Sequence, residues 1–134
     1  MRLADLRSDL VILACAISAG IHGALVPSHF DEGTRPGLGF AAATVALTGI
    51  VVWLTWRPAS AVALAAAAAT FAGLLASYAL ATTTGVPLLH PHPEPVEGLA
   101  LATKAIEIAG LLAATALLRR RVAITHERPK GALT

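Results

Sequence analysis

The sequence predicts an all-α integral membrane protein, built as an antiparallel bundle of four transmembrane helices. Hydrophobic residues make up 56% of the 134 residues and the mean hydropathy is +0.71, whereas soluble domains are about 45–50% apolar. The apolar residues gather into four stretches, each near the ~20 residues that a helix needs to cross a ~30 Å hydrocarbon core. Since lipid admits only helices or closed barrels, we expect spans at about 10–26, 38–56, 59–82 and 96–118.

The first span is expected to end at Val26-Pro27, because proline removes a backbone donor and disfavours continued helix. Residues 28–37 contain further proline and glycine and are predicted to form the loop that reverses the chain. The second span ends with Trp53 and Trp56 beside Arg57, which is typical of a headgroup boundary. Pro58 then suits the first turn of the next helix.

The third span carries Ala69, Gly73 and Ser77 at intervals of four, a small-xxx-small pattern that lets helix backbones approach closely. We expect this face to pack inside the bundle, with dimerisation as the alternative. The segment before the fourth span has prolines at 87, 91, 93 and 95, which favour an extended path. Residues 1–121 are therefore predicted to form one four-span domain, followed by a flexible tail at 122–134.

The distribution of Lys and Arg predicts how the bundle lies in the membrane. With both termini inside, the cytoplasmic side carries Arg2, Arg7, Arg57, Arg119, Arg120, Arg121, Arg128 and Lys130. The outer side carries only Arg35, and Lys104 falls within the fourth span. The positive-inside rule therefore predicts a multi-pass protein of the plasma (inner) membrane with both termini cytoplasmic. Because the basic residues lie at span ends, the expected partner is the lipid bilayer and not nucleic acid.

Ionisable residues inside the spans are the first candidates for function. His22 lies in the first span, and Glu107 lies near the middle of the fourth, three residues after Lys104. Because such groups are costly in lipid, they are expected to face the bundle interior and to have partners. Three interpretations follow. Lys104 and Glu107 form a structural ion pair, or Glu107 and His22 form a buried site for a proton or another ligand, or the placement of these residues is incidental.

A second group of donors belongs to the predicted outer loops. Imidazole and carboxylate together suit Zn²⁺ or Cu²⁺, and no cysteine or methionine cluster is present to hold Cu(I). His90 and His92 would point to the same side of an extended segment. Haem ligation is a further alternative, but His22 is the only histidine deep in a span, so ligation by two histidines would need His29 or a second protomer. The complete candidate metal set is His22, His29, Glu32, His90, His92, Glu94 and Glu107.

Short motifs give the chain a resemblance to a known group of proteins. The run from Gly20 to Glu32 contains His22 and, seven residues later, His29-Phe30; Gly85-Val86-Pro87 and Glu94-Pro95-Val96 follow before the last span. In these motifs, over roughly residues 10–118, the chain resembles a family of small, uncharacterised four-span integral membrane proteins of high-GC bacteria. The resemblance implies a recurring set of two histidines and one glutamate, which correspond here to His22, His29 and Glu107. Such proteins often carry an aspartate near the start of the last span, where this chain has Ala100.

The sequence contains none of the GxSxG, HExxH, CxxC, P-loop or dinucleotide-binding motifs, so no enzymatic activity is expected. We expect a non-enzymatic membrane protein that binds a cation, either a proton or a transition metal, between the first and fourth spans. His29, Glu32 and Glu94 would lie at the outer entrance to this site. The alternatives are an accessory subunit of a larger membrane complex and a small secondary transporter acting as a homo-oligomer.

Overall fold

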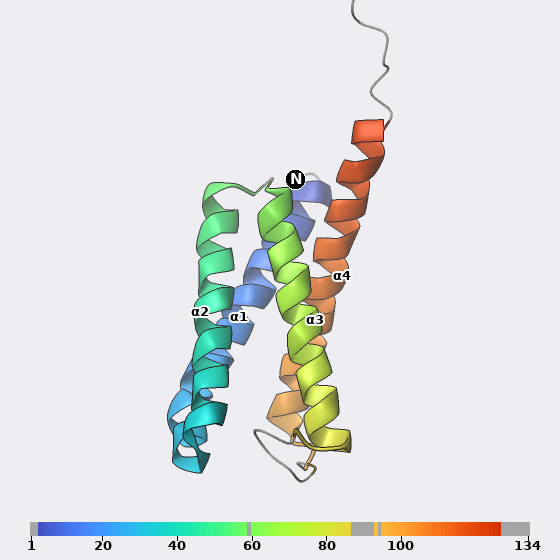
Figure 1. The fold of residues 1–134 in the computed structure, drawn as a ribbon. Helices are drawn as coiled ribbons and strands as arrows, with labels where there is room; N and C mark the ends of the chain where they lie inside the picture. The colour runs from blue at the N-terminus through green and yellow to red at the C-terminus, as the bar shows by residue number, and fades with distance from the viewer. Residues whose placement is uncertain (1–2, 59, 87–92, 94, 127–134) are drawn as a thin grey trace, which may run out of the picture.

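The computed structural model describes residues 3–58, 60–86, 93 and 95–126, and within these residues the chain forms four long α-helices packed side by side (Figure 1). The helices run alternately up and down the bundle. Their bounds are α1 (Leu3–Glu32), α2 (Thr34–Trp56), α3 (Ala61–Thr83) and α4 (Gly98–His126).

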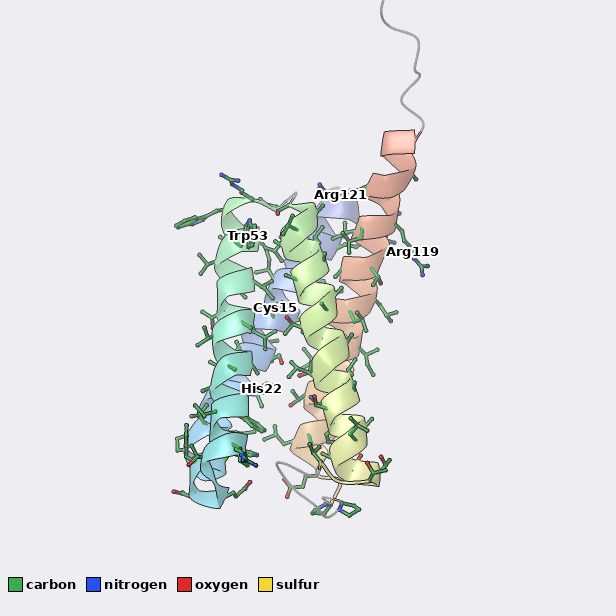
Figure 2. The ribbon with its side chains drawn as sticks, in the orientation of Figure 1. Cys15, His22, Trp53, Arg119 and Arg121 are labelled. Atoms are coloured by element: carbon green, nitrogen blue, oxygen red, sulfur yellow. The ribbon has the colours of Figure 1, made fainter. Side chains whose placement is uncertain are left out.

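The two ends of the bundle differ in which connections they carry. At the terminal end, α1 and α3 begin and α2 and α4 finish; at the loop end, Gly33 joins α1 to α2, α3 finishes and α4 begins (Figure 1). The helices α2 and α3 lie close at the terminal end and diverge toward the loop end. Trp53, Arg119 and Arg121 all lie toward the terminal end (Figure 2).

Each helix contains a segment that is long and apolar enough to cross a membrane. These segments are Leu6–Glu32, Thr34–Trp56, Ala61–Thr83 and Gly98–Arg121. The predicted all-α, four-helix architecture of a multi-pass membrane protein is therefore confirmed. The placement of the terminal end in the cytoplasm stays a prediction from the Lys and Arg distribution.

The loop predicted over residues 28–37 is wrong, because α1 continues through Pro27 and ends at Glu32. Pro27 leaves only the carbonyl of Gly23 without its helical donor, a loss that membrane helices tolerate. Gly33 alone separates α1 from α2, and its N–H donates to the carbonyl of His29 at 3.1 Å. The six additional residues carry α1 about 9 Å beyond the predicted end of the first span.

The other helix ends also differ from the predicted spans. Ser60 caps α3, since its hydroxyl accepts from the N–H of Ala63 at 3.2 Å, and the helix begins at Ala61. Helix α4 continues to His126, so the first part of the predicted tail is helical. Residues 127–134 lie outside the described part of the chain.

The centre of the bundle is a continuous apolar core to which all four helices contribute. A glycine allows its closest packing: a Cβ on Gly110 of α4 would lie 2.5 Å from Cε2 of Phe71 and 2.8 Å from Cβ of Ala14. The Phe71 ring is completely buried. Phe71 of α3 and Ala14 of α1 therefore reach the α4 backbone at a position where any side chain would collide.

The small-xxx-small stripe of α3 does not pack inside the bundle. Ala69, Gly73 and Ser77 are all exposed, and a Cβ on Gly73 would meet nothing within 4 Å. The expectation that this face packs in the interior is wrong, because Ala63, Leu64, Ala67 and Phe71 on the opposite side of α3 fill that role. Dimerisation through the exposed face stays a prediction.

Candidate functional site

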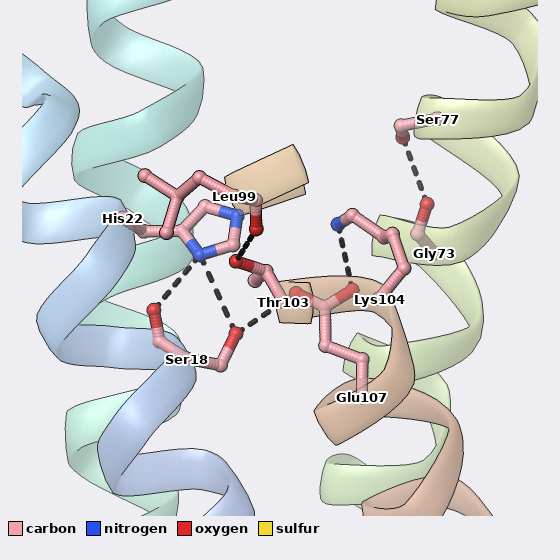
Figure 3. A network of polar contacts seen from close by, with 8 residues as sticks. All are labelled: Ser18, His22, Gly73, Ser77, Leu99, Thr103, Lys104 and Glu107. Carbon is pink, nitrogen blue, oxygen red and sulfur yellow. Dashed lines mark hydrogen bonds and ion pairs between the residues drawn. The ribbon is translucent and has the colours of Figure 1, made fainter. Parts of the chain in front are cut away.

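His22 and Glu107 belong to one buried polar cluster between α1 and α4 (Figure 3). Glu107 is 0% exposed and His22 is 6% exposed. The two side chains do not bond directly, because Ser18 of α1 lies between them. The Ser18 hydroxyl donates to Oε1 of Glu107 at 2.9 Å, and its oxygen is 3.4 Å from Nδ1 of His22.

The hydrogen bonds of His22 define its tautomer. Nδ1 lies 2.9 Å from the backbone carbonyl of Ser18, and a carbonyl only accepts, so Nδ1 carries the proton. In the neutral ring Nε2 then holds a free lone pair. Both hydrogen bonds of His22 to described residues involve Nδ1, and none involves Nε2. Ser18 can accept from Nδ1 of His22 while it donates to Glu107, which gives a continuous imidazole–hydroxyl–carboxylate chain.

Lys104 neutralises the carboxylate from the same helix. Its Nζ lies 2.6 Å from Oε2 of Glu107, one turn away, and its side chain is 13% exposed. The ammonium also lies 5.5 Å from the ring centre of Tyr78 on α3, close enough for a cation–π contact. The predicted Lys104–Glu107 pair is therefore present, and it removes the cost of an isolated buried charge.

His29 repeats the geometry of His22 two turns closer to the loop end. Its Nδ1 lies 2.8 Å from the carbonyl of Leu25, and its ring stacks on Phe40 of α2 at 3.5 Å between centroids. Phe40 also contacts the His22 ring at 5.2 Å. Because α1 stays helical beyond Pro27, the two histidines share one face. Helix α2 adds no ionisable side chain beyond Arg35, so Phe40 meets them with an apolar surface.

The candidate metal ligands do not come together within the described residues. No group of three or more His, Cys, Asp or Glu side chains there is positioned to hold a metal ion. Both carboxylate oxygens of Glu107 are already bonded to Ser18 and Lys104. Glu32 lies exposed at the last residue of α1. His90, His92 and Glu94 lie outside the described residues, so their part in the predicted set stays untested.

Two side chains of the cluster were not among the residues selected from the sequence. Ser18 is 0% exposed and occupies the central position, and Thr103 is buried on α4, where its hydroxyl donates to the Leu99 carbonyl at 2.8 Å. Ser18 precedes His22 by four residues and Thr103 precedes Glu107 by four. Helical spacing from each ionisable residue would have found both.

Comparison of the chain with protein-family models, with curated proteins and with solved structures finds no match. The fold and the cluster by themselves define a class: a four-span integral membrane protein with a buried imidazole–hydroxyl–carboxylate chain in its interior.

Replacing Ser18 with Ala tests whether the central hydroxyl holds the cluster together. We expect a loss of about 1–3 kcal/mol in the free energy of unfolding, because Oε1 of Glu107 is left buried without its donor. Ser77→Ala is the matched control, since Ser77 is exposed and bonds only to the carbonyl of Gly73 on its own helix. Unfolding by SDS in mixed micelles measures both variants. Equal stabilities would contradict a structural role for the Ser18–Glu107 bond.

Proposed function

We propose that this chain is a non-enzymatic membrane protein that binds a proton at the Glu107–Ser18–His22 chain. The observation that carries the proposal is the completely buried Ser18 hydroxyl, which bonds to a buried carboxylate and adjoins a buried imidazole. A hydroxyl in this position both accepts and donates, as proton transfer between two titratable groups requires.

The geometry allows a balanced transfer. A proton binds the free lone pair of Nε2 of His22, and the imidazolium then releases the proton on Nδ1 to the Ser18 oxygen. Ser18 at the same time releases its own proton to Oε1 of Glu107. His22 ends neutral with its proton on Nε2, Ser18 keeps one proton, and Glu107 becomes a neutral acid. The 3.4 Å separation between Nδ1 and the Ser18 oxygen must shorten for this step.

Lys104 gives proton binding an electrostatic consequence. Before protonation Lys104 and Glu107 form a neutral pair, and afterwards the interior carries the uncompensated ammonium of Lys104. Because a lone charge is costly in this environment, proton binding favours movement of Lys104 toward water. Among the cations considered, a proton fits best, since both carboxylate oxygens already have partners and a metal ion would have to displace them.

Infrared titration of the protein in lipid vesicles tests proton binding directly. We expect a carboxylic-acid carbonyl band that appears as pH falls and is absent from Glu107→Gln. His22→Ala should shift the pH at which the band appears, because it removes the neighbouring imidazole. Glu97→Gln is the control, since Glu97 is exposed at the loop end and its loss should leave the buried carboxyl band unchanged.

Two results would reject the proposal. One is a buried carboxyl band that is identical in wild type and Glu107→Gln. The other is a transition metal that copurifies with the wild-type protein but not with His22→Ala or Glu107→Gln. That result would assign the site to a metal ion.

An accessory subunit is the second candidate, and the exposed face of α3 favours it. Ala69, Gly73 and Ser77 leave a flat surface on which a partner helix could pack closely. Crosslinking in native membranes distinguishes the candidates. One abundant heterologous partner that is lost in Gly73→Leu, but kept in Glu107→Gln, would favour the accessory role.

A further inference from the structure

We infer that the Glu107 site exchanges protons only with the loop end of the bundle, and that Phe71 closes the site toward the terminal end. The inference rests on the proposed proton binding and adds the side of the membrane from which the proton comes. Two independent observations support it: polar groups continue from the site toward the loop end, and an apolar core follows it on the other side.

Toward the loop end, the cluster is bordered by polar and partly exposed side chains. The Lys104 side chain is 13% exposed, and His29 is half-buried on the face of α1 that also carries His22. Seven residues separate His29 from His22, which is about 10 Å of helix. The ionisable side chains described on the helices packed around Glu107 near this level are His22, His29 and Cys15 on α1, Tyr78 on α3 and Lys104 on α4. His29 is therefore the next ionisable side chain toward the loop end on the face of α1 that carries His22.

Toward the terminal end, the buried side chains described in the next helical turn carry no hydroxyl, imidazole or carboxylate, and the thiol of Cys15 is only a weak hydrogen-bond donor. Ala14 and Cys15 precede Ser18 on α1, Gly110 follows Glu107 on α4, and Phe71 fills the space between them from α3. All four are buried, and we call them the apolar layer. Figure 2 shows Cys15 inside the bundle on the terminal side of His22.

The core beyond the apolar layer is also built from apolar side chains. The buried core side chains nearer the terminal end are apolar and 0–8% exposed: Val11, Leu54, Ala63, Leu64, Ala67, Ala113, Ala114 and Leu117. Ser8 is the one buried polar residue described on that side, and it is ten residues, or about 15 Å of helix, from Ser18. A lone hydroxyl at that distance cannot continue a hydrogen-bonded chain.

Phe71 is the residue that closes the site, because its ring lies against the α4 backbone one turn from Glu107. A Cβ on Gly110 would lie 2.5 Å and 2.7 Å from two ring atoms, so no gap separates the ring from the helix. Truncation to alanine would remove the ring and leave a space that connects Glu107 with the core nearer the terminal end. Water that entered this space would join the site to the terminal end.

Proton flux in vesicles tests this arrangement. Wild type, Phe71→Ala, Phe71→Ala/Glu107→Gln and Phe30→Ala are reconstituted, a potential is applied with potassium and valinomycin, and an enclosed pH dye records the flux. We expect the proton flux of vesicles with the wild-type protein to equal that of protein-free vesicles. The flux with Phe71→Ala should be several-fold faster. The double variant should return to the wild-type rate, because the flux passes through Glu107. Phe30→Ala should stay tight, since Phe30 is an exposed ring at the loop end.

The single native cysteine provides a second readout. Cys15 is completely buried in the apolar layer, so a membrane-impermeant maleimide should not label it in folded wild type from either side. In Phe71→Ala, reagent in the compartment at the terminal end should label it. If Phe71→Ala does not reconstitute as a helical protein, labelling of wild-type Cys15 from the terminal side would by itself overturn the inference.

The two proposals fail in different ways. A folded Phe71→Ala variant that stays proton-tight, or wild type that conducts protons through Glu107, would overturn the closure while the infrared band of Glu107 still titrates. Loss of that band would instead remove the proposed function.

Discussion

Replacing Lys104 with Met should lower the free energy of unfolding by about 3–5 kcal/mol, the cost of orphaning one member of a buried ion pair. Glu107 is 0% exposed and accepts from Nζ of Lys104 at 2.6 Å, so without the ammonium only Ser18 compensates its charge. Unfolding by SDS in mixed micelles, followed by circular dichroism, measures the loss.

The reverse substitution and the double variant act as controls. Glu107→Leu should cost less than Lys104→Met, because the Lys104 side chain is 13% exposed and its long stem can carry the ammonium toward water. Lys104→Met/Glu107→Leu should recover most of the loss, since apolar replacement of both partners leaves no buried charge. A double variant as unstable as Lys104→Met would contradict the prediction that the loss in Lys104→Met comes from the unpaired charge of Glu107.

Replacing Gly110 with Ala should destabilise the bundle by about 1–3 kcal/mol, because the new methyl group overpacks a filled core. The methyl carbon would lie 2.5 Å from Cε2 of Phe71 and 2.8 Å from Cβ of Ala14, and neither neighbour has free space. The three helices that meet at this position would have to move apart.

Gly73→Ala is the matched control for Gly110→Ala. It introduces the same methyl group into another membrane helix, where nothing lies within 4 Å. It should leave the unfolding midpoint unchanged or raise it slightly, because Ala favours helix over Gly by about 1 kcal/mol. Equal midpoints for the two variants would contradict the close packing of Phe71 on α4.

The closure by Phe71 bears directly on the transporter alternative. Transport needs access to Glu107 from both ends of the bundle, yet one turn from the carboxylate the interior is filled by Phe71, Ala14 and Cys15. A protein with this interior can bind a proton from one side and respond to it. Transport would require a second conformation in which Phe71 leaves Gly110.

Much of the fold could be predicted because lipid imposes simple rules on sequence. Four apolar stretches of sufficient length predict four helices, and the structure has four, each with a segment able to span a membrane. Helix ends were predicted less well. Pro27 was expected to end the first helix, but α1 continues through it, since membrane helices tolerate the loss of one backbone hydrogen bond, and the added turn places His29 against Phe40.

The interior of the bundle was only partly predictable, because composition does not say which way a helix turns. The Ala69–Gly73–Ser77 face was expected to face the bundle interior, but it lies on the outer surface, since Phe71 and the other buried residues of α3 occupy the interior side of the helix. The cost of charge in lipid correctly selected His22, Lys104 and Glu107 as side chains of the interior. It could not select Ser18, whose importance depends on contact with a residue 89 positions away.

By itself, then, the sequence determined the number of helices, their approximate lengths and the ionisable residues that must avoid lipid, because transfer energies depend on residue type. The tertiary structure alone decided that Ser18 joins His22 to Glu107 and that Phe71 packs on Gly110. Those contacts depend on how four helices rotate and fit against one another, which local chemistry does not encode.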